Sequence, residues 1–254
     1  MSNFDLAAAS YDDQFSNTCI GKEQRRQVWK CIEKYIRLET PNVLEINCGT
    51  GEDAILWSNK GAKVHATDIS EAMINIAKEK HPQIDFEVLD VNHLDHHSGS
   101  YDLIFSNFGG LNCLSPTQLK AFFQSTKEKL NPDGTLQIVL MGGKCWWDKL
   151  FLILKGRWKE RNRRNSSEGI PVNVEGKMVT TWYYSPKEIE QLAMGLFDIE
   201  SKHPIGLFIP PSFLAKAFER HKIAFSMLKF LDKFLTFSFL SNRADHYFVS
   251  LKLK

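Results

Sequence analysis

The segment NVLEINCGTG, residues 42–51, carries the clearest structural signal in this sequence. Its first half, Asn42 to Ile46, is a short apolar run of the kind that forms a buried strand. Gly49 and Gly51 follow, and a glycine-rich turn between a strand and a helix lets backbone N–H groups approach a ligand closely. The stretch therefore predicts a strand, a turn and a helix, with a ligand at the turn.

Apolar runs alternate with helical patterns on both sides of this unit. Strands are predicted at residues 42–46, 63–67, 84–89, 101–108 and 135–141. Helices are predicted at residues 22–38, from about Glu52 to Gly61, after a cap at Ser70, and from a capping box at Ser115 to about Leu130. Strands that alternate with helices imply parallel pairing through right-handed crossovers, hence a doubly wound α/β sheet.

Polar residues or glycines stand where four of these strands end. In doubly wound sheets the ligand lies beyond the carboxyl ends of the strands, at the point where the strand order reverses. These residues are therefore candidates for one site, and they are Glu45, Asn47, Gly49, Gly51, Asp68, Asp90, Asn107, Gly109 and Gly110.

Spacing alone leaves two ligands open. The glycines and Ala54 also spell the dinucleotide pattern GxGxxA, with Asp68 roughly 20 residues further on. Glu45 favours a different ligand, because a carboxylate before the turn would repel a pyrophosphate but can attract an ammonium group. Asp90 ends the third strand, where it could hold an adenine amino group.

The segment EINCGTG, residues 45–51, resembles the first motif of the class I S-adenosylmethionine-dependent methyltransferases, acidic-x-Gly-x-Gly-x-Gly. The resemblance continues through TDIS, LDV, YDLIFSNF and LNPDGTL, over about residues 40–142. SYDDQF, residues 10–15, resembles the tyrosine-bearing segment that covers the cofactor in small-molecule members. Asn47 replaces the first glycine of the motif, and asparagine tolerates left-handed backbone better than most residues.

The resemblance implies a role for each matching position in binding S-adenosylmethionine. Glu45 would hold the ammonium group, Asp68 the two ribose hydroxyls and Asp90 the adenine amino group. The turn backbone would line the methionine part, and Asn107 and Phe108 would lie near the sulfonium. No side chain is singled out as a catalytic base. The positions implied as cofactor-binding are Tyr11, Glu45, Asn47, Gly49, Gly51, Asp68, Ile69, Asp90, Val91, Asn107 and Phe108.

The resemblance further implies a Rossmann-like sheet of seven strands, five of them parallel and the last two an antiparallel hairpin at residues 198–206 and 246–253. The chain then divides into an N-terminal helical lid over residues 1–40 and a cofactor-binding core over residues 41–143. Residues 144–254 would form an aromatic-rich cap and the final strands of the same domain.

Composition excludes several classes of protein. Thirty-two Lys and Arg nearly balance thirty Asp and Glu in 254 residues, so the overall charge does not select for nucleic acid. The five cysteines and eight histidines lack zinc-type spacing, which predicts reduced thiols and no metal site. The N-terminus has no signal or transit pattern, so a cytoplasmic location is expected.

Two segments in the second half leave alternatives open. Residues 155–164 carry six basic side chains around Trp158, which suits a solvated insertion helix or a contact with an anionic substrate or nucleic acid. Residues 222–240 are rich in Phe but are interrupted by charges, and they are too short to cross a bilayer. They suit a helix that covers the core, a substrate wall or a peripheral contact with a membrane surface.

The expected function is transfer of a methyl group from S-adenosylmethionine to a small, apolar or aromatic molecule by in-line displacement. The alternatives are an RNA or protein methyltransferase that uses the basic segment, an NAD(P)-dependent oxidoreductase and a catalytically silent binding protein. NFGG, residues 107–110, makes a nucleic-acid acceptor unlikely, because amino methyltransferases of that type usually carry Pro-Pro and an aromatic residue at this point.

Overall fold

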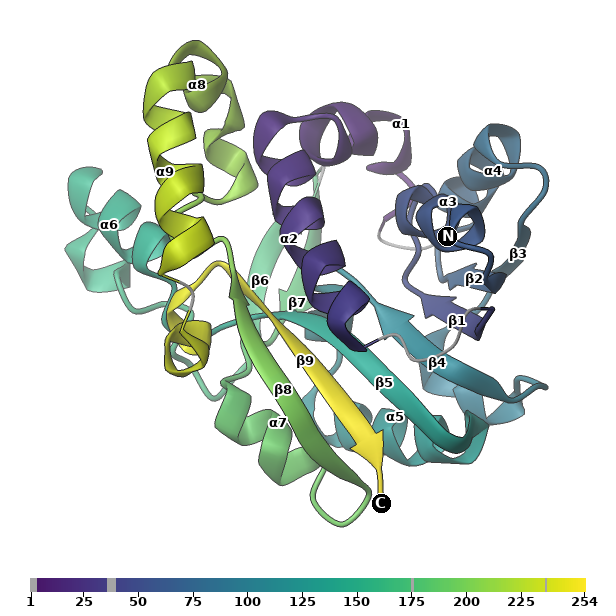
Figure 1. Cartoon of the computed structure of the whole chain (residues 1–254). Helices are drawn as coiled ribbons and strands as arrows, with labels where there is room; N and C mark the ends of the chain where they lie inside the picture. The colour runs from purple at the N-terminus through teal and green to yellow at the C-terminus, as the bar shows by residue number, and fades with distance from the viewer. Residues whose placement is uncertain (1–3, 36–39, 175, 236) are drawn as a thin grey trace.

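The computed structural model describes residues 4–35, 40–174, 176–235 and 237–254. Seven strands form one mixed sheet in the order β3-β2-β1-β4-β5-β9-β8, and β6 pairs with β7 in a separate ribbon (Figure 1). The strands are β1 (Asn42–Ile46), β2 (Lys63–Asp68), β3 (Asp85–Val88), β4 (Tyr101–Ser106), β5 (Leu130–Met141), β6 (Ile170–Val174), β7 (Lys177–Thr181), β8 (Phe197–Ile205) and β9 (His246–Leu253).

The strand directions confirm the predicted sheet. β1 to β5 pair in parallel, and β9 runs antiparallel to both β5 and β8. The order reverses between β1 and β4, so the carboxyl ends of β1 and β4 flank the switch point. The helices are α1 (Ala8–Tyr11), α2 (Cys19–Tyr35), α3 (Glu52–Asn59), α4 (Glu71–Lys80), α5 (Pro116–Lys129), α6 (Trp146–Leu154), α7 (Pro186–Leu192), α8 (Ala215–Arg220) and α9 (Lys222–Phe234).

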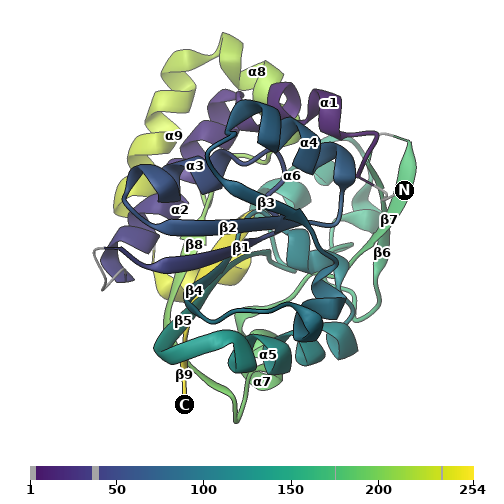
Figure 2. The same cartoon turned by 90° about the vertical axis from the view of Figure 1, so that its right-hand side faces the viewer.

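Helices cover both faces of the sheet. Figure 2 shows α2, α3 and α4 on one side and α5 and α7 on the other. Alternate strand residues divide between the two layers, since Val43 and Phe105 pack with Trp57 of α3, whereas Leu44 and Ile104 belong to the cluster on the opposite face. Burial on both faces explains why the parallel strands read as continuous apolar runs.

Local capping explains where three of the helices begin. The Ser70 hydroxyl accepts a hydrogen bond from the Met73 N–H at 3.2 Å. Ser115 and Gln118 form the predicted capping box of α5. A second capping box, at Ser185, opens α7. Each cap satisfies an N–H group that the first turn of a helix would otherwise leave unpaired.

The structure differs from the sequence-based expectations in three places. β5 starts at Leu130 and not at residue 135 as expected, and the added residues are irregular at Asp133, whose φ is 65°. Residues 155–164 do not continue the α6 helix, which ends at Leu154; they form turns and one short 3₁₀ turn. The β6–β7 ribbon was not predicted. Residues 36–38 of the first expected helix lie outside the described residues.

The predicted helix over the Phe-rich segment exists as α9, but it covers the core with few of its aromatic residues. Phe225 is buried, whereas Phe230 and Phe234 are exposed. Within the described ranges, no helix combines the length and the apolar character that crossing a bilayer requires.

Candidate functional site

The turn between β1 and α3 is left-handed at three positions. The φ angles of Asn47, Gly49 and Gly51 are 57°, 55° and 84°. The turn is fixed to β2, because the Cys48 N–H donates to the Thr67 carbonyl at 2.9 Å. Gly51 lies directly before the first turn of α3, so the positive end of that helix dipole faces the region beyond β1.

Asn47 can occupy the position of the motif glycine because Gly110, which lies beside it, has no side chain. Its amide nitrogen donates to the Ser106 hydroxyl at 3.2 Å, which holds the side chain against the end of β4. A Cβ atom on Gly110 would lie 2.5 Å from the Cβ atom of Asn47. The asparagine that replaces a motif glycine is therefore accommodated by the absence of a side chain at Gly110.

Glu45 is a buried carboxylate with an unused oxygen. The residue is 1% exposed, and its Oε2 atom has no hydrogen-bond partner. Burial raises the pKa of Glu45 well above its usual range, and the nearby Asp53 carboxylate adds to the shift. A buried, unpaired carboxylate is costly unless a cation or donor completes it. The ammonium group of S-adenosylmethionine fits this position.

Asp68 ends β2 and lies against the turn. Its Oδ2 atom accepts a hydrogen bond from the Gly49 N–H, and its Oδ1 atom accepts one from the Ser70 N–H, both at 2.9 Å. Burial raises the pKa of Asp68, although these two N–H groups oppose the shift. The backbone therefore fixes the carboxylate in one orientation, as recognition of a ribose diol requires. The neighbouring Ile69 is 41% exposed, an apolar surface beside that carboxylate.

Asp90 follows β3 and caps the 3₁₀ turn that begins at Val91. Its Oδ1 atom accepts from the Asn92 N–H and from the Asn92 side-chain amide, both at 2.9 Å. Val91 is half-buried and packs against the core on the α5 face. Asp90 thus combines a local capping role with its position at a strand end, and its contact with adenine stays a prediction.

Asn107 directly follows β4, and its amide points toward α3. The Asn107 Nδ2 atom donates to Asp53 Oδ2 at 2.9 Å, and its Oδ1 atom accepts from the Phe108 N–H. Phe108 has a φ of 47°, a left-handed conformation that is uncommon for a bulky residue. Such backbone strain is frequent at functional sites.

Sequence reasoning missed the charged pair that organises this site. Arg25 on α2 donates from Nε to Asp53 on α3 at 3.1 Å, and the Trp29 indole donates to the same carboxylate at 2.7 Å. The Arg25 guanidinium carbon also lies 5.3 Å from the centre of the Phe108 ring. Asp53 therefore connects α2 to Asn107. The amphipathic pattern of α2 carried no signal for this contact.

Two residues of the described N-terminal segment, Tyr11 and Asp12, lie against the glycine turn. A Cβ atom on Gly49 would be 3.6 Å from the Tyr11 ring, and burial raises the pKa of Tyr11 to about 12. Asp12 accepts from the Thr50 hydroxyl at 2.6 Å and pairs with Lys80 at 2.8 Å. The described part of the segment therefore has the placement that a lid requires, and its role as a lid stays a prediction.

The Glu45 environment predicts that cofactor binding depends on pH. An ammonium group favours the ionised carboxylate, whereas burial in the free protein favours the protonated one. Binding should therefore release protons, and the Kd for S-adenosylmethionine should fall as pH rises through the elevated pKa of Glu45. Calorimetric titrations in buffers of different ionisation enthalpy measure this release.

Glu45→Gln is the matched variant for that measurement. It keeps the shape of the side chain and removes the titration, so its proton release should be smaller and its Kd should vary less with pH. Equal proton release in the two proteins would contradict the role of Glu45.

A cavity of about 970 Å³ lies beyond the carboxyl end of β5. Gly143, Arg164 and Tyr183 line it, together with Phe237 and Phe239. It is not the predicted cofactor pocket, since none of its lining residues belongs to the glycine turn. A chain of contacts connects the two regions, because Arg164 pairs with Asp245 at 3.1 Å and the next residue, His246, contacts the Phe108 ring.

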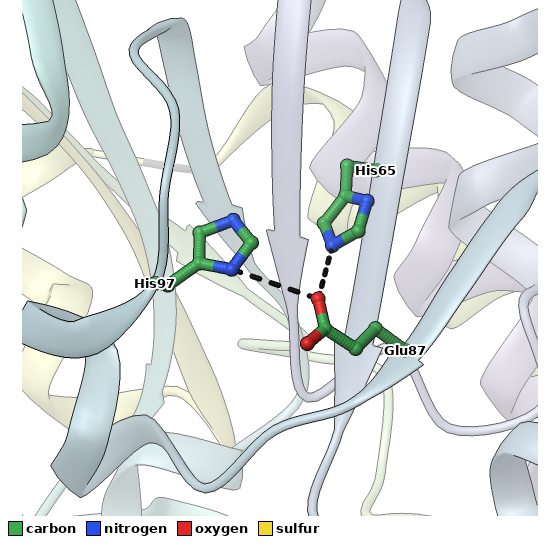
Figure 3. A group of neighbouring side chains, drawn as sticks. All are labelled: His65, Glu87 and His97. Carbon is green, nitrogen blue, oxygen red and sulfur yellow. Dashed lines mark hydrogen bonds and ion pairs between the residues drawn. The ribbon is translucent and has the colours of Figure 1, made fainter.

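His65 and His97 are far apart in the sequence, but both lie next to Glu87 of β3 (Figure 3). One ring nitrogen of His65 lies 2.9 Å from Glu87, and a ring nitrogen of His97 lies 3.6 Å from the same carboxylate oxygen. The second nitrogens contact Asp85 and the Tyr101 hydroxyl, both at 2.7 Å. Each ring nitrogen thus has a protein partner, and we assign no metal to this group. The absence of a metal site stays a prediction.

Known proteins resemble this chain over the region that carries the site. Residues 43–134 match a family model described as a methyltransferase domain. An uncharacterised protein of Methanocaldococcus jannaschii is 29% identical over 99% of this chain and 90% of its own length. A demethylmenaquinone methyltransferase of Renibacterium salmoninarum is 28% identical over 46% of this chain and 49% of its own.

The fold comparison agrees. Magnesium protoporphyrin IX methyltransferase of Synechocystis, solved with bound S-adenosylhomocysteine, superimposes with a TM-score of 0.59 at 14% identity, covering 92% of this chain and 85% of that one. Apart from the archaeal protein, the first curated relatives are matched over only 26% to 49% of their own length. The matched segment contains the glycine turn and the strand-end carboxylates. Residues 43–134 of the chain match the methyltransferase-domain family, and the fold is the one seen in S-adenosylmethionine-dependent methyltransferases.

Proposed function

We propose that the chain transfers a methyl group from S-adenosylmethionine to a small apolar or aromatic molecule. The observation that carries the proposal is Glu45, a buried carboxylate with an unpaired oxygen directly before a left-handed glycine turn. A dinucleotide would bring a diphosphate to this turn, where the carboxylate repels it. The site therefore suits a cofactor with an ammonium group better than NAD(P).

S-adenosylmethionine supplies a methyl group that is already activated by its attachment to a sulfonium. The protein then has to orient the acceptor in line with the methyl group and exclude water, and orientation alone can lower a barrier by roughly 7–11 kcal/mol. Glu45 would fix the ammonium group of the cofactor, and Asp68 would fix its ribose. The Arg25–Asp53 pair would position Asn107 and Phe108, and Tyr11 would cover the turn.

We place the acceptor in the cavity beyond β5, whose volume of about 970 Å³ lies within the range of small-molecule pockets. The aromatic rings of Tyr183, Phe237 and Phe239 contribute to its wall, and charged and polar side chains form the rest, so the cavity also accommodates polar groups of an acceptor. The relative from Renibacterium salmoninarum is named for a quinone-type acceptor, which supports the same class. Arg164 would offer a positive group at one side of the cavity, but it is already paired with Asp245.

The structure weakens the case for a nucleic-acid acceptor. Of the basic residues in the segment 155–164, Arg163 pairs with Asp148 at 2.6 Å, Arg164 is buried, and Arg157 pairs with Glu160. These arginines are engaged within the protein. We therefore do not extend the proposal to RNA.

Isotope labelling tests the proposal directly. The protein is incubated with cell extract and with S-adenosylmethionine labelled on its methyl group, and the labelled product is identified by mass spectrometry. We expect the label in a small molecule that extracts into organic solvent. Label in RNA or protein would show that the acceptor is a macromolecule and not a small molecule. Cofactor binding without any labelled product would favour a binding protein without catalytic activity.

A further inference from the structure

Exposed apolar side chains are concentrated in one part of this chain. Of the seventeen large apolar residues that are exposed in the described ranges, twelve lie in residues 146–158 and 213–239. These segments include α6, α8 and α9, which Figure 1 places on one side of the molecule, with α3, α4 and β3 on the other. Large exposed apolar patches mark interaction sites.

The α9 helix shows the pattern most clearly. Phe225 and Asp232 mark its buried face, and Asp232 accepts hydrogen bonds from the backbone N–H groups of residues 207–209. On the opposite side, four residues at helical spacing form an apolar stripe. They are Ile223, Met227, Phe230 and Phe234, which are 83%, 65%, 63% and 57% exposed.

Basic side chains flank this stripe. Lys222, Lys229 and Lys233 recur at the same helical spacing along one edge of the stripe, roughly 60–100° around the helix from the nearest apolar residue. A helix that is anchored by one face, apolar on the other and lysine-rich at its flank has the composition of helices that lie on anionic bilayers. An ordinary surface helix would instead be polar on its outer face.

A second stripe stands on the adjoining helix. Trp146, Leu150 and Leu154 of α6 follow one another at intervals of four residues and are 40%, 47% and 77% exposed. The two helices are connected through α8, because Trp147 of α6 contacts the ring of Phe218 and α8 leads into α9.

Positive charge is concentrated in the same segments as the exposed apolar side chains. Residues 144–164 contain eight basic and two acidic residues, and residues 213–243 contain six and two. Together they carry a formal charge of +10, so the remainder of a chain with a net charge of +2 carries −8. A positive and apolar region on an otherwise acidic protein is complementary to a surface whose outer layer is negatively charged and whose interior is apolar.

We propose that α6 and α9 dock the protein on an anionic lipid bilayer, with the two apolar stripes inserted at the level of the headgroups and the flanking lysines at the phosphates. The inference is independent of methyl transfer. It also gives the exposed aromatic residues of the Phe-rich helix a role.

Vesicle binding of the full chain tests this proposal. Phosphatidylcholine vesicles with phosphatidylglycerol should bind the protein, vesicles of phosphatidylcholine alone should bind it at least about tenfold more weakly, and added salt should weaken binding. The double variant Ile223→Ser, Phe230→Ser should lower the partition coefficient at least about tenfold. Lys222→Gln, Lys233→Gln should reduce binding and its dependence on salt.

The matched control is Met178→Ser, Met194→Ser. These residues are 56% and 75% exposed but lie outside the two segments, so the change should leave vesicle binding as it is. The melting temperature of each variant shows that it is folded. The proposal is overturned if the wild-type protein does not bind anionic vesicles, or if the control loses binding as much as the α9 variant. It is also overturned if light scattering finds a dimer that Ile223→Ser, Phe230→Ser dissociates without any vesicle binding.

Discussion

Replacing Asp68 with alanine is expected to raise the Kd for S-adenosylhomocysteine by at least about 100-fold. Hydrogen bonds to a charged group contribute about 1.5–3 kcal/mol each, and the variant would lose the two to the ribose hydroxyls. Each 1.4 kcal/mol corresponds to about a tenfold change in Kd. Isothermal titration calorimetry measures the change.

Two further variants test whether the loss of the ribose contacts is what weakens binding. Asp68→Asn keeps the shape of the side chain and an oxygen for one backbone N–H group, so it should fold and still bind weakly. Asp198→Ala removes a carboxylate from β8 that is 73% exposed, and it should bind like the wild type. If Asp68→Ala bound the product with unchanged affinity, the assignment of the ribose to this carboxylate would be wrong.

The largest expected loss of stability comes from Asp245→Ala. The Asp245 carboxylate is buried, lies 3.1 Å from Arg164 and accepts a hydrogen bond from the Gln24 amide at 3.1 Å. Removing it would leave the Arg164 guanidinium buried without this partner, and breaking a buried pair in this way costs about 3–5 kcal/mol. Urea denaturation should show that decrease in the free energy of unfolding.

This contribution should depend on pH in a defined direction. Burial alone would raise the pKa of Asp245, but the neighbouring His246 and Arg164 outweigh it and lower the pKa below its usual value. The stabilisation is therefore fully present above the unfolded-state pKa of about 4 and is lost as pH falls through the lower folded-state pKa. A difference between wild type and Asp245→Ala that stayed below 1 kcal/mol at neutral pH, or that grew on acidification, would contradict this account.

The sheet was predictable because its signals are local. A buried parallel strand is a short apolar run, and a helix start needs a cap, so Ser70 and Ser115 marked boundaries that the structure confirms. The carboxyl ends of parallel strands lie at one edge of such a sheet, which is why the sequence alone predicts that Glu45 and Asp68 share a site.

The contacts that arise only from tertiary packing were not predictable. Arg25 looks like one polar residue on an amphipathic helix, and its pairing with Asp53 depends on how α2 crosses α3. The sequence left open whether the aromatic residues of α9 face the core, a substrate or a membrane surface, because periodicity shows that a face is apolar but not which partner covers it. The need for a glycine at position 110 was likewise not predictable, because the Asn47 side chain lies beside it only in the folded chain.

Calorimetric titration of the wild-type protein with S-adenosylhomocysteine tests the central claim, that the strand ends bind an adenosyl cofactor with an amino-acid tail. We expect one molecule bound per chain, with proton release that Glu45→Gln reduces, and no heat of binding from NAD(H) or NADP(H). Binding of a nicotinamide dinucleotide without binding of S-adenosylhomocysteine would contradict the account.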